Sequence, residues 1–191
     1  MKGSLTKTED SITFKLLFLS RIEEKKGLDI FISALSMVTV PYHLTIAGTG
    51  AANYLEALKL IAVNNHVDDK ISWVGFYSEN KFKLLQDHDL FILPSHDENF
   101  GNAVIESLCV GTPVLISEQV GLAEYVTENN LGWVCQTNVN SVGNAINNIA
   151  KNCQAGLERI RKNAPDVIYD DFDSGNLVKK YVDMYKKLIK I

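Results

Sequence analysis

Cysteine is scarce in this chain of 191 residues. The three cysteines, Cys109, Cys135 and Cys153, lie far apart, and no two of them form a CxxC pair. An odd number of widely spaced cysteines provides neither a disulfide framework nor a zinc-binding pattern. We therefore expect free thiols in a reducing, cytoplasmic compartment.

Long hydrophobic runs are also missing. The first 14 residues lack the apolar stretch of a signal peptide, and no later run approaches the ~20 residues of a membrane-spanning helix. We expect residues 1–14 to be a flexible segment or a boundary introduced at expression. Residues 15–191 are expected to form a single domain, and any association with a membrane would come through another domain.

An excess of positive charge is the third absence. The chain has 23 acidic residues against 19 basic ones, and its formal net charge is −4. Because a nucleic-acid-binding protein needs a basic surface, nucleic acid is not expected as a partner. A local basic site for a small anion is still compatible with this balance.

The chain does contain a regular alternation of short apolar runs and longer amphipathic segments. Apolar runs predict six strands, at residues 15–20, 42–48, 70–75, 89–95, 112–117 and 131–135. Predicted helices lie at residues 27–38, 52–66, 78–88, 100–111, 122–125, 138–151, 155–163 and from 174 to the end. This alternation predicts an α/β fold, a doubly wound, Rossmann-like parallel sheet with helices on both faces. Ligands bind such sheets at the carboxyl ends of the strands.

The loop after the first predicted strand, SRIEEKKG, brings two cations to the start of a helix. Arg21 follows the strand, and Lys26 precedes Gly27. An arginine fork, a lysine charge and a helix N-terminus together suit a diphosphate. The alternative is a solvated loop in which Glu23 and Glu24 pair with the lysines, and the loop taken by itself favours that alternative.

The next loop, GTGAAN, imitates part of a dinucleotide fingerprint. Asn53 stands where the third glycine belongs, and the loop follows the second strand rather than the first. These departures argue against an NAD-dependent oxidoreductase. The glycines indicate a tight turn with a close backbone approach, either to a ligand or to a neighbouring strand.

The loop after the fourth predicted strand holds the most informative carboxylates. Glu98 precedes the next helix, and Glu106 lies inside it. Helical side chains lean toward the N-terminus, so Glu106 can reach a ligand at the helix start. There it would accept both hydroxyls of a ribose, while Glu98 would hold hydroxyls of a transferred sugar. The amides of Phe100, Gly101 and Asn102 would point to the same place.

Each of these features also has an explanation without a ligand. A helix dipole stabilises acidic residues near its N-terminus, which fits Glu98 well. It fits Glu106 less well, because apolar residues surround it and a buried carboxylate needs a partner. For Glu106 we favour a ligand over a structural ion pair. Gly121 opens a short helix and indicates a weaker anion site, and His88 is predicted to end a helix, where a cation is favourable.

In their order, these loops resemble those of the family 4 retaining glycosyltransferases, which pair two Rossmann-like domains in the GT-B architecture. ENFGNAVIE, from Glu98 to Glu106, is similar to the family's E-x7-E motif, with FILPS before it and ESLCVGTPVLIS after it. SRIEEKKG resembles the family's arginine–lysine loop. VGF (74–76) resembles the stretch near the nucleotide base, and FDSGNLVKKYVDMYKKL resembles the last helix. The resemblance covers nearly the whole chain from about Lys15.

The resemblance implies a role for each group of loop residues. A catalytic group would comprise Glu98, Arg21 and Lys26. A donor-binding group would comprise Glu106, Phe100, Gly101, Asn102, Gly75, Phe76 and Gly121. Within these groups, Arg21 and Lys26 would bind the diphosphate, and Glu106 the ribose. No metal and no cofactor is expected, since the two cations would stabilise the leaving diphosphate.

Two residues depart from the family's pattern. Val120 stands where a second glycine beside Gly121 is common, and Asn99 replaces a frequent glycine. The family also has an acceptor-binding N-terminal domain, which nothing in this chain resembles. The chain is therefore predicted to be the C-terminal donor-binding half, inactive alone, of a retaining hexosyltransferase. Its donor would be a UDP or GDP sugar, and its acceptor a saccharide or lipid-linked molecule in polysaccharide biosynthesis.

Two other functions stay open. A nucleotide-sugar epimerase of the same architecture would share the fold and the diphosphate site but would act without an acceptor. A noncatalytic module would keep only the affinity for a nucleotide. The fold class does not decide among them, because doubly wound sheets host many functions.

Overall fold

Six parallel strands form one sheet in the order β3-β2-β1-β4-β5-β6. The computed structural model describes residues 13–77 and 80–189. The strands are β1 (Phe14–Leu19), β2 (Tyr42–Ala47), β3 (Ile71–Gly75), β4 (Leu90–Leu93), β5 (Val114–Ser117) and β6 (Gly132–Cys135). From β1 the chain winds to one edge of the sheet, and from β4 it winds to the other. The predicted α/β, doubly wound fold class is confirmed, and the direction of winding reverses between β1 and β4.

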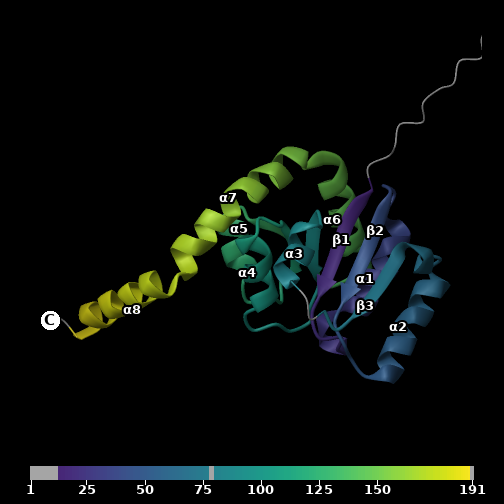
Figure 1. The fold of residues 1–191 in the computed structure, drawn as a ribbon, viewed down its shortest axis with the longest axis horizontal. Coiled ribbons are helices and arrows are strands. Elements are labelled where there is room, and N and C mark those ends of the chain that lie inside the picture. Colours follow the sequence, from purple (N-terminus) through teal and green to yellow (C-terminus); the bar gives the residue numbers. More distant parts are fainter. Residues whose placement is uncertain (1–12, 78–79, 190–191) are drawn as a thin grey trace, which may run out of the picture.

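Helices cover both faces of this sheet (Figure 1). They are α1 (Leu28–Ala34), α2 (Ala52–Asn64), α3 (Lys81–Gln86), α4 (Asn102–Cys109), α5 (Ala123–Glu128), α6 (Val139–Asn152), α7 (Gln154–Phe172) and α8 (Ser174–Ile189). Helix α1 packs against α2 and α6, and α4 packs against α3 and α7. Because parallel crossovers are right-handed, winding in two directions places these two groups on opposite faces.

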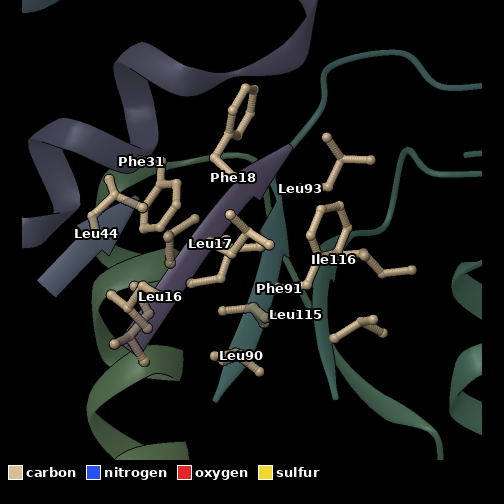
Figure 2. Packing of buried hydrophobic residues seen from close by; sticks show 14 of the residues in the cluster. Leu16, Leu17, Phe18, Phe31, Leu44, Leu90, Phe91, Leu93, Leu115 and Ile116 are labelled. Carbon is tan, nitrogen blue, oxygen red and sulfur yellow. The ribbon is translucent and has the colours of Figure 1, made fainter. Parts of the chain in front are cut away.

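The core lies along the central strands. All residues of β4 and β5 are buried, and Leu16, Leu17 and Phe18 of β1 are inaccessible to solvent. Figure 2 shows side chains from β1, β4 and β5 packed on both sides of the strands. A strand covered on both faces gains from apolar side chains at consecutive positions, each contributing about 1.5–3 kcal/mol. This is why continuous apolar runs, rather than alternating ones, marked the strands.

Helix α7 is longer than predicted, because it continues through Pro165 to Phe172. A proline lacks the backbone N–H, so the carbonyl of Arg161 loses its helical partner. Gly111 lies against that carbonyl: a Cβ there would be 2.4 Å from the Arg161 oxygen. Apolar residues remain buried at helical spacing on both sides of the proline, namely Leu157, Ile160, Ala164 and Ile168. Packing against α4 therefore outweighs the cost of the proline.

Helix α8 extends away from the rest of the molecule (Figure 1). Asp173 has an extended backbone and separates α8 from α7. The exposed large apolar residues of α8 are Val178, Tyr181, Val182, Met184, Tyr185 and Ile189. An apolar face of this kind is typical of a surface that meets another protein or another domain.

None of the helices in the described part of the chain combines the length and the apolar composition that a membrane crossing requires.

His88 does not behave as a cation at a helix end. It follows α3 and is buried, with Nδ1 2.7 Å from the carbonyl oxygen of Leu84 and Nε2 2.8 Å from the hydroxyl of Thr45 on β2. Burial lowers the pKa of His88, so the neutral form is favoured and the predicted favourable cation is wrong. The imidazole instead fastens the end of α3 to the sheet.

Candidate functional site

The loops after β1 and β4 lie against each other, because these strands are neighbours in the sheet. Gly27, at the start of α1, has a φ of +67°, and a Cβ there would lie 2.1 Å from the carbonyl oxygen of Pro94. The amide of His96 donates to the carbonyl of Lys25 at 2.8 Å. Only glycine accommodates both the backbone angle and the close approach, so Gly27 lets the two loops meet.

Lys26, which is buried, forms an ion pair with the partly buried Glu98 between these two loops. Their side chains are only 7% and 19% exposed. A buried lysine needs a compensating partner, and the carboxylate at the end of the β4 loop provides it. The structure thus brings together two members of the predicted catalytic group. The alternative pairing of Lys26 with a glutamate of its own loop is wrong.

Arg21, the third member of that group, lies in solvent. Its Nη1 is 2.8 Å from Glu23 Oε1, and its side chain is 71% exposed. Glu23 also approaches the ammonium of Lys25, at 3.8 Å. The alternative prediction of a solvated loop of paired charges is therefore partly correct, with Glu23 as the glutamate that pairs with Lys25. Exposed pairs of this kind contribute at most about 1 kcal/mol, so a stronger anionic partner can readily displace them.

Glu106 has an ion-pair partner that the sequence pattern did not indicate. Its Oε1 is 2.7 Å from Nζ of Lys81, in the first turn of α3. Both side chains are partly exposed. Glu106 was predicted to meet a ligand rather than a structural ion pair. The structure gives it an ion pair, so that part of the prediction is wrong. Lys81 precedes Glu106 by 25 positions, and only the packing of α3 on α4 brings them together. The role of Glu106 toward a ribose stays a prediction.

The loop after β5 is fastened to the backbone of Glu98. The amide of Glu98 donates to the carbonyl of Gln119 at 3.2 Å, and the amide of Gly121 donates to the carbonyl of Glu98 at 2.8 Å. A Cβ at Gly121 would lie 2.0 Å from the carbonyl oxygen of Asn99. A backbone contact therefore explains why glycine stands there, and the anion-binding role of Gly121 stays a prediction.

The residues between Glu98 and α4 connect the loop to the end of α7. Gly101, with a φ of +85°, immediately precedes Asn102, the first residue of α4. Phe100 is exposed, and its ring centroid lies 6.0 Å from that of Phe172. Tyr125 packs edge-on against Phe172 as well, at 5.3 Å. This aromatic cluster was not predicted, because its members come from three elements distant in sequence.

Gly75 and Phe76 lie at the carboxyl end of β3, at the edge of the sheet. Gly75 has a φ of +68°, and a Cβ there would meet nothing within 4 Å. Phe76 is 74% exposed, so this corner of the molecule presents an open aromatic surface. From here the chain leads to α3 and Lys81. The role of Gly75 and Phe76 toward a nucleotide base stays a prediction.

The GTG loop approaches a neighbouring segment of the chain rather than an open space. A Cβ at Gly48 would lie 1.9 Å from the carbonyl oxygen of Ser20, and one at Gly50 would lie 2.1 Å from that of Ile22. The glycines therefore allow the loops after β1 and β2 to pack closely. A pocket of about 420 Å³ lies between these loops, with Arg21 in its lining.

The histidine, carboxylate and cysteine side chains also bear on metal binding and on disulfides. Within residues 13–77 and 80–189, no group of three or more histidine, cysteine, aspartate or glutamate side chains is arranged to hold a metal ion. The three cysteines are free thiols, as expected.

Comparison with known sequences identifies relatives over most of the chain. Residues 6–167 match the family model for glycosyl transferases group 1. The chain is 26% identical to an uncharacterized glycosyltransferase of Methanocaldococcus jannaschii, over 90% of this chain and 44% of that protein. It is 33% identical to the amylovoran biosynthesis glycosyltransferase AmsK of Erwinia amylovora, over 63% and 31% of the two chains. The chain therefore spans less than half the length of these relatives.

Solved structures match the fold closely. HepE of Anabaena, in complex with UDP and glucose, superimposes with a TM-score of 0.80 at 21% identity, over 92% of this chain and 48% of HepE. The C-terminal domain of LpcC, a glycosyl transferase group 1 family protein of Francisella tularensis, matches with a TM-score of 0.74 at 15% identity. That match covers 84% of this chain and 87% of the LpcC domain. The fold is therefore that of one Rossmann-like half of the GT-B architecture, as expected.

Proposed function

Because this chain belongs to the glycosyl transferases of group 1, we propose that it binds the nucleoside-diphosphate sugar of a retaining hexosyltransferase. The observation that carries the proposal is the pair of lysine–carboxylate contacts, Lys26 with Glu98 and Lys81 with Glu106. They place both carboxylates of the E-x7-E pattern beside cations, near the carboxyl ends of the central strands. Cations and carboxylates side by side suit a ligand that has both phosphates and hydroxyls.

The diphosphate would bind between Arg21 and Lys26. Arg21 is exposed and only weakly engaged, so its guanidinium is free to grip phosphate oxygens in a fork. Lys26 is held in place and would add a fixed positive charge near the N-terminus of α4. As the bond to the sugar breaks, these charges would stabilise the leaving diphosphate. This arrangement needs no metal ion.

The sugar and the ribose would bind on either side of the diphosphate. Glu98, with the amides of Phe100, Gly101 and Asn102, would hold hydroxyls of the donor sugar. Glu98 is held in place by its ion pair with Lys26, so we assign it hydrogen bonding to the sugar rather than nucleophilic attack, and a paired-carboxylate hydrolase mechanism is not proposed. Glu106 would accept the ribose hydroxyls.

The nucleotide base would lie near the open corner at Gly75 and Phe76. The exposed ring of Phe76 offers a surface on which a base can stack. Gly121 would line the phosphate end of the site from the loop after β5. UDP is the first candidate, because UDP is bound in the structure of HepE, and GDP is the second.

The acceptor would bind to a second domain. The chain covers only part of its relatives, and α8 presents an apolar face without a partner in the described structure. We propose that this face packs on the acceptor-binding N-terminal half, so that the active site lies between the two halves and this half alone is inactive. A role in the cytoplasm, in polysaccharide biosynthesis, agrees with the free thiols and with the relative from amylovoran biosynthesis.

The test is calorimetric titration of this chain with UDP, GDP and ADP, beside the variants Arg21→Ala and Glu106→Ala. We expect one nucleotide to bind best and both substitutions to weaken it, with unchanged circular dichroism. Lys83→Ala is the matched control, because Lys83 is an exposed cation whose partner is Asp87 of the adjoining turn. If no nucleotide binds either to this chain or to a protein that joins it to an acceptor-binding half, the proposal fails.

A second measurement separates the transferase from the epimerase. The two-domain protein is incubated with its donor, with and without saccharide or lipid-linked acceptors. A transferase forms a glycosylated product only when the acceptor is present, whereas an epimerase alters the donor sugar without one.

A further inference from the structure

The ion pair between Lys81 and Glu106 joins the first turn of α3 to α4. Its two side chains are 44% and 29% exposed, so water reaches both of them. Neither charge needs the other for its solvation, and the pair contributes little to the stability of the fold. What the contact does determine is the orientation of the Glu106 carboxylate.

We propose that Lys81 is a positioning residue, which holds Glu106 in the orientation that accepts the ribose hydroxyls of the donor. This inference rests on the proposed function. A glutamate side chain that is free in solvent samples several rotamers, and binding a ribose would require one of them to be selected. The contact with Nζ of Lys81, at 2.7 Å, makes that selection before the ligand arrives. A preorganised group loses less conformational entropy on binding.

The backbone of Lys81 is well placed for this task. Asn80 caps α3, because its side-chain oxygen accepts hydrogen bonds from the amides of Phe82 and Lys83, each at 3.1 Å. Leu85 is buried, and α3 packs against α4. The point from which Lys81 extends is therefore fixed relative to the helix that contains Glu106.

The lysine and the ribose can occupy the carboxylate together. An ionised carboxylate has about four lone-pair sites, and Lys81 uses one of them, on Oε1. Enough sites remain for two hydroxyl groups. A lysine that instead competed with the ribose would have the opposite effect, because its removal would tighten binding. The sign of the change on substitution therefore distinguishes positioning from competition.

The experiment compares Lys81→Met with Lys83→Met. Lys83 lies on the same helix, and its Nζ is 2.6 Å from Asp87, so its substitution removes the same charge without touching Glu106. Each protein is titrated with UDP and with 2′-deoxy-UDP, or with GDP and 2′-deoxy-GDP where GDP is the base bound. We expect Lys81→Met to weaken the ribonucleotide about fivefold and the 2′-deoxynucleotide less than about twofold. Lys83→Met should change neither, and Lys81→Arg should keep the preference for ribose.

Two results overturn the proposal while leaving the nucleotide site in place. One is a ribose preference that is the same in Lys81→Met as in the unmodified chain, and the other is tighter binding of UDP by the variant. A general loss of structure would weaken both nucleotides equally, so the ratio separates positioning from misfolding. An unmodified chain that binds a nucleotide without preferring ribose also overturns this inference at Glu106 and leaves the nucleotide site in place. If no nucleotide binds to this chain or to the two-domain protein, the proposed function fails first, and this inference falls with it.

Discussion

Two regions at the carboxyl edge of the sheet use the same residue types under opposite conditions. In the central region, between the loops after β1 and β4, Lys26 is buried against Glu98. In the edge region, from β3 to α3, Lys81 meets Glu106 with both side chains partly in water. Burial makes the first pair a part of the fold, whereas water reaches both charges of the second. A lysine–glutamate pair therefore matters for folding when it is buried and matters little when water surrounds it.

Breaking the buried pair should have the largest effect. Lys26→Met leaves the carboxylate of Glu98 largely buried without its cation, and we expect a loss of about 3 kcal/mol in the free energy of unfolding. Urea denaturation followed by circular dichroism measures it. The double variant Lys26→Met with Glu98→Gln should be more stable than Lys26→Met alone, because no unpaired charge remains. A single variant as stable as the unmodified chain would show that the pair is not buried in solution.

Two glycines provide the next comparison. Gly27 and Gly75 have nearly equal φ angles, +67° and +68°, but a Cβ at Gly27 would strike the carbonyl of Pro94, whereas one at Gly75 would meet nothing. Gly75→Ala should cost about 1 kcal/mol in unfolding free energy for the backbone angle alone. Gly27→Ala should cost at least about 2 kcal/mol, because the clash is added. Equal costs for the two substitutions would mean that the central loops do not pack as described.

The next prediction concerns His88, which joins the end of α3 to Thr45 on β2. Burial lowers the pKa of His88 in the folded chain below its unfolded value of 6.5. The unfolded chain therefore binds more protons than the folded chain as the pH falls. The contribution of His88 to the free energy of unfolding is fully present above pH 6.5 and declines below it. The loss for this one group is at most about 1.4 kcal/mol per pH unit. Unfolding at pH 7.5, 6.5 and 5.5 measures it, and His88→Gln should remove this part of the pH dependence while staying folded. The same slope in the variant would assign the effect to other groups.

Removing the exposed cation should have the smallest effect on the fold. Lys81→Met is expected to change the free energy of unfolding by less than about 0.5 kcal/mol, since both partners are solvated. Thermal unfolding beside Lys83→Met measures the difference. A loss comparable to that of Lys26→Met would erase the distinction between the two regions.

Much of the fold could be predicted because its determinants are local. All six strands were predicted within a few residues. The central strands are covered on both faces, so they are read directly as apolar runs. Helix α7 was predicted too short, because Pro165 is a local stop signal and the packing that overrides it is not local. The same limit applies to the aromatic contacts of Phe100 with Phe172, which join the β4 loop to the end of α7.

The candidate site was predictable as a set of loops, but its pairings were not. Glu98, Glu106, Arg21 and Lys26 could be singled out by their places after strands and near helix starts. Their partners come from elsewhere, and neither Lys81 nor the buried state of Lys26 has a signature in the order of residues. The glycines of GTG were predicted as points of close approach, and Gly121 as the opening of a short helix that would suit an anion. The segment approached turned out to be the protein's own backbone in each case.

The sequence by itself determined the alternation of strands and helices, the doubly wound class and the loops that surround the carboxyl edge, because hydrophobic periodicity acts over a few residues at a time. The tertiary structure alone decided which lysine meets which carboxylate. Lys26 and Glu98 are 72 positions apart, and Lys81 and Glu106 are 25 apart. Such distances in sequence are closed only by the order of strands in the sheet and by the packing of helices on it. The same packing decides which charges are buried and which face water.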